Sequence, residues 1–342
     1  MSPPVFVVGV PRSGTTLLRR HLNAHPDLHL TFEASWFGVR ASQPKGWTPA
    51  ERRVGWERSL SLAWQRASLD KIAPVEVDPG VCADPHLPYA RLMKRCAQRA
   101  GKARWGDKSP AHITHVGSLL ESFPGCRIVH IVRDPVRVVE SLLAVPWGNP
   151  SILGNALTVR ALLKRVAPFR DRIHELRLED LLADRRGALA DVLDFCDLPW
   201  SEQVLDPDTF AVEDTPPLPW LRTRSADRAQ AHERPRLPPV DRHRVARVTA
   251  QARHSYGYPE LDRVSRGSLG AHLQRAWTDI REGVSVVRFL MGLRRQLHTL
   301  PGPDAVSLFD AVNHFHVDAA LACTPEQRAH LVNWLSPDAP SG

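Results

Sequence analysis

The segment that follows the first apolar run combines glycine, arginine and hydroxyl side chains in a pattern that suits anion binding. Gly9 and Gly14, with four residues between them, separate the run Val5–Val8 from a helical stretch. Glycine lets backbone N–H groups turn inward, and the start of the helix adds the positive end of its dipole. Arg12 can hold a phosphate or sulfate through two parallel hydrogen bonds, and threonine hydroxyls add donors. The predicted anion-binding residues are Pro11, Arg12, Ser13, Gly14, Thr15 and Thr16.

This segment differs from the phosphate loop of nucleotide hydrolases. That loop continues from its second glycine into Lys and then Ser or Thr, whereas Gly14 is followed by Thr15 and Thr16. The alternative is a plain turn, in which the glycines only fit the bend between a strand and a helix. The run Arg-Ser-Gly-Thr-Thr directly after a strand favours anion binding.

The run Pro-Arg-Ser-Gly-Thr-Thr-Leu-Leu at residues 11–18 resembles a known phosphosulfate loop. It is similar to the 5′-phosphosulfate loop of sulfotransferases that use 3′-phosphoadenosine-5′-phosphosulfate (PAPS). The resemblance covers roughly residues 5–260 and is closest to the bacterial and tyrosylprotein-type branch, because the animal cytosolic branch normally has a lysine in this loop. It implies a three-layer α/β fold related to nucleotide kinases, PAPS as co-substrate and no metal.

A donor that also carries a 3′-phosphate requires a second anion site. Arg133 follows the strand-like run Arg127–Val132, and Ser141 comes eight residues later on the next expected helix. Ligands of open α/β sheets bind beyond the carboxyl ends of the strands, where Arg133 falls. The pattern Arg-Asp-Pro…Ser resembles the 3′-phosphate motif of the family. Taken alone, Arg133 would equally suit an ion pair with Asp134 or Asp180.

Two further residues match positions that carry chemistry in the family. Sulfuryl transfer needs an in-line hydroxyl, a base for its proton, and positive charge at the bridging oxygen that leaves. Glu33 stands as far after the loop arginine as the catalytic glutamate of the tyrosylprotein branch, which implies a general base. Lys108, in an Asp-Lys-Ser-Pro segment, resembles the family lysine that contacts the bridging and transferring oxygens. Arg12 is expected to share its charge-stabilising role.

Other assignments stay open. Taken singly, Glu33 would suit a surface position and Lys108 a solvated loop, and His112 is the alternative base, since other branches use histidine. Ser225 is expected to add a late contact to the nucleotide. A position near Leu178, often aromatic in the branch, is leucine here, so the residues that contact adenine are unassigned. A bacterial small molecule, a glycan or glycolipid, or a peptide tyrosine all remain open as acceptor.

The elements that must position these residues alternate along the chain. Alternating strands and helices predict a parallel sheet covered on both faces. We therefore expect an α/β fold with a three-layer, P-loop-type parallel sheet flanked by helices. The expected strands lie at residues 5–8, 28–31, 104–106, 127–132 and 173–178. Among the expected helices are segments at 17–24, 113–122, 189–195 and 241–255.

We divide the chain at residue 262. Residues 1–262 are expected to form the sulfotransferase domain, with a mostly helical acceptor-site region at 35–100 and a proline- and charge-rich loop at 200–240. Residues 263–342 have the pattern of an amphipathic helical extension. We expect this extension to pack over the acceptor side or to form a homodimer contact.

Composition is typical of a globular protein. The chain is 43% hydrophobic and 24% charged, and no apolar run is long enough to span a membrane. The net charge of +8 suits an anionic ligand, but the basic residues are scattered, which gives no sign of nucleic-acid binding. The five cysteines lack metal-type spacing, and only four residues precede the first strand. We therefore expect a cytoplasmic protein with free thiols.

Two functions compete with a PAPS-dependent transferase. A small-molecule or nucleotide kinase is disfavoured because the loop lacks Gly-Lys-Ser/Thr and no aspartate ends a strand as a magnesium ligand would. A non-catalytic nucleotide-binding protein would have no need of both Glu33 and Lys108. The sequence thus predicts sulfuryl transfer from PAPS to a hydroxyl, with release of adenosine 3′,5′-bisphosphate.

Overall fold

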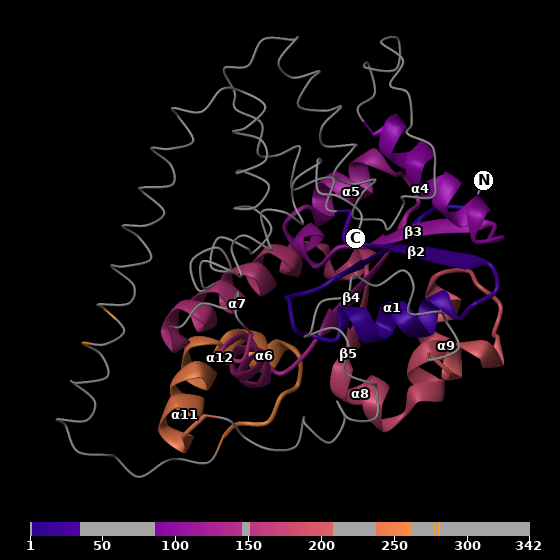
Figure 1. Cartoon of the computed structure of the whole chain (residues 1–342). Coiled ribbons are helices and arrows are strands. Elements are labelled where there is room, and N and C mark those ends of the chain that lie inside the picture. The colour runs from indigo at the N-terminus through magenta and orange to yellow at the C-terminus, as the bar shows by residue number, and fades with distance from the viewer. Residues whose placement is uncertain are drawn as a thin grey trace, which may run out of the picture. The chain divides into compact units, whose positions relative to one another are not determined.

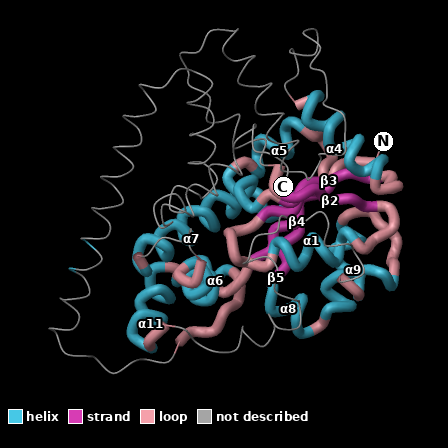
Figure 2. Tube along the Cα trace, viewed as in Figure 1, coloured by secondary structure: helices cyan, strands magenta, loops and turns pink. Residues whose placement is uncertain are grey.

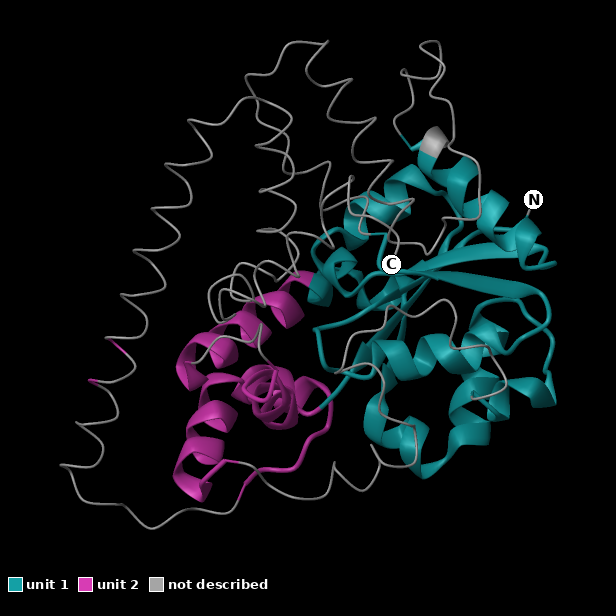
Figure 3. Cartoon of the chain, viewed as in Figure 1, with its two compact units in different colours: residues 1–133, 166–229 teal, residues 134–165, 230–342 magenta. Residues whose placement is uncertain are grey.

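The structure is a computed structural model, and it describes residues 2–34, 86–145, 151–207 and 237–261, with the single positions 277 and 280. The chain divides into two compact units, coloured teal and magenta in Figure 3. The first comprises residues 1–133 and 166–229, and the second comprises residues 134–165 and 230–342.

The first unit is built on a five-stranded sheet (Figures 1 and 2). Its spatial order is β2-β3-β1-β4-β5, and each neighbouring pair is parallel. The strands are β1 (Val5–Val8), β2 (Leu28–Phe32), β3 (Arg104–Lys108), β4 (Arg127–Val132) and β5 (His174–Arg177). The predicted parallel sheet is confirmed.

The register of the strands brings their carboxyl ends to one edge. Val7 near the end of β1 aligns with Lys108 of β3 and with Val129 of β4. Phe32, the last residue of β2, also aligns with Lys108. The side chains that follow the strands therefore gather along this edge, where ligands of such sheets bind.

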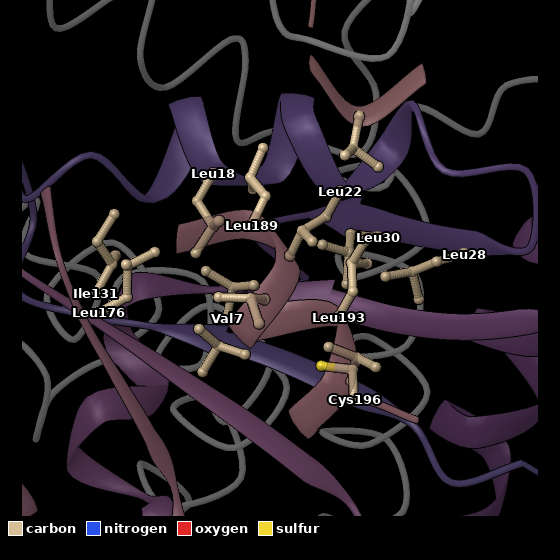
Figure 4. Packing of buried hydrophobic residues seen from close by; sticks show 14 of the residues in the cluster. Val7, Leu18, Leu22, Leu28, Leu30, Ile131, Leu176, Leu189, Leu193 and Cys196 are labelled. Atoms are coloured by element: carbon tan, nitrogen blue, oxygen red, sulfur yellow. The ribbon is translucent and has the colours of Figure 1, made fainter. Parts of the chain in front are cut away.

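One face of the sheet is covered by α1 (Thr15–Asn23), α8 (Leu178–Ala183) and α9 (Arg185–Phe195). Leu18 and Leu22 of α1 pack with Leu189 and Leu193 of α9 over the strands (Figure 4). Alternate residues of β1, β2 and β4, Val5 and Val7 in β1 for example, belong to this cluster because strand side chains alternate between faces. This face is an aliphatic core.

The opposite face carries α4 (Leu87–Arg99), the 3₁₀ turn η2 (Pro110–Thr114) and α5 (Val116–Ser122). Its core is aromatic. The ring centroid of Phe6 lies 5.9 Å from that of Trp105 and 5.5 Å from that of Phe123. Tyr89 of α4 completes the group, 6.0 Å from Trp105. The other turns of the unit are η3 (Ala167–Arg172) and η4 (Glu202–Leu205).

The second unit contains α6 (Pro135–Leu142), most of α7 (Ile152–Val166), α11 (Pro239–Val248) and α12 (Ala250–Ser255). The Asp134 carboxylate caps α6 by accepting a hydrogen bond from the Val136 N–H at 3.0 Å, and it also pairs with Arg253. Glu140 of α6 pairs with Arg137 at 2.9 Å and with Arg242 of α11 at 3.6 Å.

Several element boundaries differ from the predicted ones. The strand predicted at 104–106 continues to Lys108, because the two charged residues at its end are buried among polar partners. The helix predicted at 241–255 is interrupted at Thr249, whose hydroxyl donates to the Val245 carbonyl at 2.8 Å and competes with the helical backbone. The short helix α8, directly after β5, was not predicted.

Some predictions fall largely on residues outside the described ranges. These are the mostly helical region at 35–100, of which the structure describes the part from residue 86, most of the loop at 200–240, and the extension at 263–342. The division at residue 262 stays a prediction. No helix in the described part of the chain combines the length and apolar character needed to cross a bilayer.

Candidate active site

The loop predicted to bind the phosphosulfate (residues 9–14, the phosphate loop) lies between β1 and α1 and packs closely on the sheet. Gly14 has φ 97°, a conformation that side chains disfavour. A Cβ at Gly14 would lie 2.7 Å from Cδ1 of Leu178, and one at Gly9 would lie 2.6 Å from the Ile131 carbonyl oxygen. Glycine is therefore required at position 9 by the close approach of a backbone oxygen and at position 14 by its positive φ, and the buried Leu178 packs against the loop.

Arg12 and Arg133 meet at this loop. Arg12 has φ 74°, which is uncommon for a residue with a side chain. Its carbonyl oxygen accepts a hydrogen bond from Nη1 of Arg133 at 3.2 Å. The residue at the end of β4 thus contacts the backbone of the loop that follows β1, and the structure brings the two predicted anion-binding arginines together.

The two acidic residues considered as partners of Arg133 pair with other arginines. Asp134 pairs with Arg253 inside the second unit, and Asp180 lies 3.7 Å from Nε of Arg177. Ser141, the other half of the predicted 3′-phosphate motif, lies on α6 in the second unit. Ser225 falls outside the described residues.

Glu33 and Lys108 are in direct contact at the ends of β2 and β3. Nζ of Lys108 lies 2.6 Å from Oε1 of Glu33. The lysine side chain has no exposed surface, whereas 31% of the glutamate side chain is exposed. The Glu33 N–H also donates to the Lys108 carbonyl at 2.8 Å, and Glu33 has φ 46°. The two residues predicted to carry the chemistry therefore form an ion pair.

The surroundings of Lys108 tune its charge. Burial lowers its pKa to about 8, while the Glu33 carboxylate opposes the shift, Arg19 adds to it, and Asp107 opposes it. Nζ also lies 3.6 Å from the centroid of the Phe32 ring, a favourable position for a cation. At neutral pH most of the molecules therefore carry an ammonium group beside Glu33.

His112, the alternative base, lies on η2 against the aromatic core. It has no exposed surface, and burial lowers its pKa to about 3. Its Nδ1 is 3.6 Å from Oδ2 of Asp107, and its ring packs 6.4 Å from that of Phe6. Glu33, at the sheet edge, is thus partly accessible, whereas His112 is enclosed in the core.

Sequence reasoning gave no role to Asp107, which the structure places in a polar cluster beside Lys108. Its carboxylate is fully buried and accepts hydrogen bonds from Tyr89, Thr31 and Ser109. The sequence feature that could have pointed to Asp107 is its position next to Lys108 in the Asp-Lys-Ser-Pro segment. In the described ranges, no group of three or more His, Cys, Asp or Glu side chains is arranged to hold a metal ion.

The chain is similar to known proteins in sequence. It is 27% identical over 226 residues to an uncharacterized protein of Aquifex aeolicus, over 59% of this chain and 26% of that protein. It is 24% identical over 221 residues to the protein-tyrosine sulfotransferase of Drosophila melanogaster, over 61% of this chain and 40% of that enzyme. The matched part is thus well under half of each of these two relatives.

Fold comparison and a family model agree with these matches. The sulfotransferase domain of the Synechococcus PCC 7002 olefin synthase superposes with a TM-score of 0.50 at 23% identity, over 76% of this chain and 96% of that domain. The model of the sulfotransferase family matches residues 3–202. These findings confirm the predicted kinship with bacterial and tyrosylprotein-type sulfotransferases. The chain belongs to the sulfotransferase family.

Proposed function

We propose that this protein transfers a sulfuryl group from PAPS to a hydroxyl of an acceptor and releases adenosine 3′,5′-bisphosphate. The observation that carries the proposal is the contact between Lys108 and Glu33, a buried ammonium beside a partly exposed carboxylate. It lies at the same sheet edge as the phosphate loop. Membership of the sulfotransferase family supports the reaction class.

The residues at this edge fit a donor with two anionic ends. Arg12 and the loop hydroxyls, at the start of α1, suit the 5′-phosphosulfate, and Arg133 suits the 3′-phosphate. Ser141 and Ser225 are proposed to add further contacts. When bound, PAPS supplies a sulfuryl group joined through a bridging oxygen to a phosphate that can leave.

The roles of Glu33 and Lys108 follow from their charges. Glu33 takes the proton of the acceptor hydroxyl onto a carboxylate oxygen while that hydroxyl oxygen bonds to sulfur. Lys108 keeps its ammonium at the bridging oxygen, where negative charge grows as the bond from sulfur breaks. Arg12 shares this role. In the resting protein the two groups neutralise each other, which offsets part of the cost of burying Lys108.

Calorimetry and product analysis test the proposal. The protein should bind adenosine 3′,5′-bisphosphate and bind ATP with magnesium weakly or not at all. Mass spectrometry of extracts from overexpressing cells should find a product heavier by one SO3, which also identifies the acceptor as a small molecule, a glycan or glycolipid, or a tyrosine peptide. Tight binding of magnesium ATP, with no affinity for the bisphosphate, would overturn the proposal in favour of a kinase.

We also propose that residues 35–100 contribute to the acceptor site and that residues 263–342 cover it or form a homodimer contact. The apolar side chains Trp277 and Ile280 are 73% and 56% exposed, which leaves them free to pack against such a partner surface. The test compares the full chain with one that ends at residue 262. Equal acceptor turnover and an equal oligomeric state would contradict this role for the extension.

A further inference from the structure

Asp107 lies next to Lys108 on β3 but faces the other side of the sheet. Successive side chains of a strand point to opposite faces. Lys108 lies on the face of α1, where it contacts Phe32, and Asp107 lies on the face of α4, where it meets Tyr89. The carboxylate has no exposed surface. A group buried in this way is costly unless its oxygens are well supplied with donors.

Four hydrogen bonds converge on this carboxylate from different parts of the unit. Oδ2 accepts from the hydroxyl of Tyr89 at 2.8 Å and from that of Ser109 at 2.9 Å. Oδ1 accepts from the Ala34 N–H at 3.3 Å and from the Thr31 hydroxyl at 3.2 Å, a hydroxyl that lies equally close to the Gly106 carbonyl oxygen and to Sδ of Met93. Burial raises the pKa of Asp107, and these four bonds oppose the shift. The carboxylate thus joins α4, β2, the end of β3 and the turn after β2.

The hydrogen bond from the Ala34 N–H links the Asp107 carboxylate to the candidate active site, because Ala34 directly follows Glu33. Glu33 has φ 46°, a conformation that persists only where the surroundings hold it. Its own N–H is held by the Lys108 carbonyl at 2.8 Å, and the next N–H is held by Asp107. Both amides that flank the Glu33 side chain are therefore tied to the end of β3.

We propose that Asp107 is a positioning residue, which holds the strained turn at Glu33 against β3 and places a second negative charge near Lys108. The inference rests on the proposed function, since it concerns the pair that carries the chemistry. Asp107 itself contacts neither donor nor acceptor. It fixes where the base stands and helps to keep the lysine protonated.

The charge of Asp107 distinguishes this role from plain packing. Among the described residues, the charged groups that act on Lys108 are Glu33 after β2, Arg19 on α1 and Asp107 on β3. On the other face, Asp107 meets Tyr89 of α4 and His112 of η2, whose pKa burial lowers to about 3. Loss of the Asp107 charge should therefore favour the neutral lysine.

Asp107→Asn tests the proposal, because it keeps the shape of the side chain and removes its charge. We expect kcat to fall about ten- to a hundredfold, as for a misplaced catalytic group, with unchanged affinity for adenosine 3′,5′-bisphosphate. The Lys108 pKa should fall below its wild-type value. It can be followed by NMR of ¹³C-labelled lysine, since the sequence holds six lysines and Lys108→Met identifies the signal.

Tyr89→Phe is the matched control, because it removes one hydrogen bond and leaves the Asp107 carboxylate in place. It should lower kcat less than Asp107→Asn does and leave the Lys108 titration unchanged. Should Asp107→Asn fail to fold, the double variant Tyr89→Phe/Ser109→Ala removes both donors to Oδ2. That variant should lower kcat at least about tenfold with bisphosphate affinity retained.

Three results would count against the inference. The inference is overturned if Asp107→Asn keeps the wild-type kcat and the wild-type Lys108 titration. A lower melting temperature of Asp107→Asn, with kcat and the titration unchanged, would mean a purely structural role and overturns it too. Wild-type kcat in the double variant overturns it as well. Failure of the proposed function would look different. Wild-type protein would then neither bind the bisphosphate nor transfer a sulfuryl group, while the Lys108 titration in Asp107→Asn would still report on the charge of Asp107.

Discussion

Two regions at the carboxyl edge of one sheet hold their cations in different ways. At β1 and β4, Arg133 contacts a backbone carbonyl of the phosphate loop. At β2 and β3, Lys108 contacts the carboxylate of Glu33. Arg133 thus donates to a neutral backbone oxygen, whereas Lys108, paired with a carboxylate, forms a matched acid and base. We therefore propose the first region for donor binding and the second for the chemical step.

Each region contains one residue with a strained backbone, and in each region that residue belongs to the proposed site. Arg12 and Glu33 have positive φ angles of 74° and 46°. The remaining non-glycine residue of this kind in the described ranges, Asp197, follows the C-terminal end of α9, where such a conformation commonly ends a helix. The two strained residues that do not end a helix, Arg12 and Glu33, thus both lie in the proposed site regions. Such strain is expected at functional sites, where the surrounding structure maintains an unfavourable backbone conformation.

The largest expected effect separates chemistry from binding. Glu33→Gln keeps the shape of the side chain but cannot take up the hydroxyl proton, so single-turnover sulfuryl transfer should slow by about a hundred- to ten-thousandfold. Lys108→Ala should be at least as damaging. Calorimetry should show that both variants keep their affinity for adenosine 3′,5′-bisphosphate.

Glu202→Gln is the matched control for Glu33→Gln, because Glu202 is exposed and pairs with Arg186 away from the sheet edge. It should leave turnover unchanged. Near-normal turnover in Glu33→Gln together with inactive His112→Ala would move the base to His112 and undo the comparison.

The next effect concerns the binding region. Arg133→Ala and Arg12→Ala should each weaken bisphosphate or donor binding by roughly 2–4 kcal/mol, because a charge-assisted hydrogen bond is lost. Arg186→Ala removes an equal charge from an exposed position and should leave affinity unchanged. If Arg133→Ala binds as tightly as the wild type, the 3′-phosphate assignment is wrong.

Local sequence patterns predicted the strands and the phosphate loop, but not which side chains contact each other once the strands have paired. The run at 127–132 and the loop after Val8 are visible as contiguous patterns. Glu33 and Lys108 were named through family resemblance, and their contact joins residues 75 positions apart. No periodicity shows such a pairing. Their roles in the reaction stay predictions.

Asp107 shows the limit of sequence reasoning most clearly. A charged pair followed by Ser-Pro has the pattern of an exposed turn, and the predicted strand therefore stopped too early. The structure buries both charges because partners arrive from Tyr89 on α4 and from Glu33 after β2. Burial of a charge depends on these distant partners, and they become neighbours only after the sheet has formed.

The pH dependence of kcat/KM tests whether turnover requires the positive charge of Lys108. Burial lowers the pKa of Lys108 to about 8, so the ammonium is present below that pH and is lost as pH rises through it. kcat/KM reports groups of the free enzyme, and it should fall about tenfold per pH unit above this point. In Lys108→Arg, the guanidinium stays charged, and the alkaline fall should move to higher pH. An alkaline fall at the same pH in this variant would assign it to another group.

The smallest effect tests how tightly the binding region is packed. Gly14→Ala introduces strain at φ 97° and a Cβ 2.7 Å from Leu178, whereas Gly101→Ala at φ 69° meets no atom within 4 Å. Gly101→Ala should cost about 1 kcal/mol of stability and no bisphosphate affinity. Gly14→Ala should cost more and weaken bisphosphate binding about tenfold, because the loop must shift. Leu178→Ala, added to Gly14→Ala, removes the clash and should restore part of that affinity. Equal affinities in Gly14→Ala and Gly101→Ala would show that the contact with Leu178 does not shape the loop.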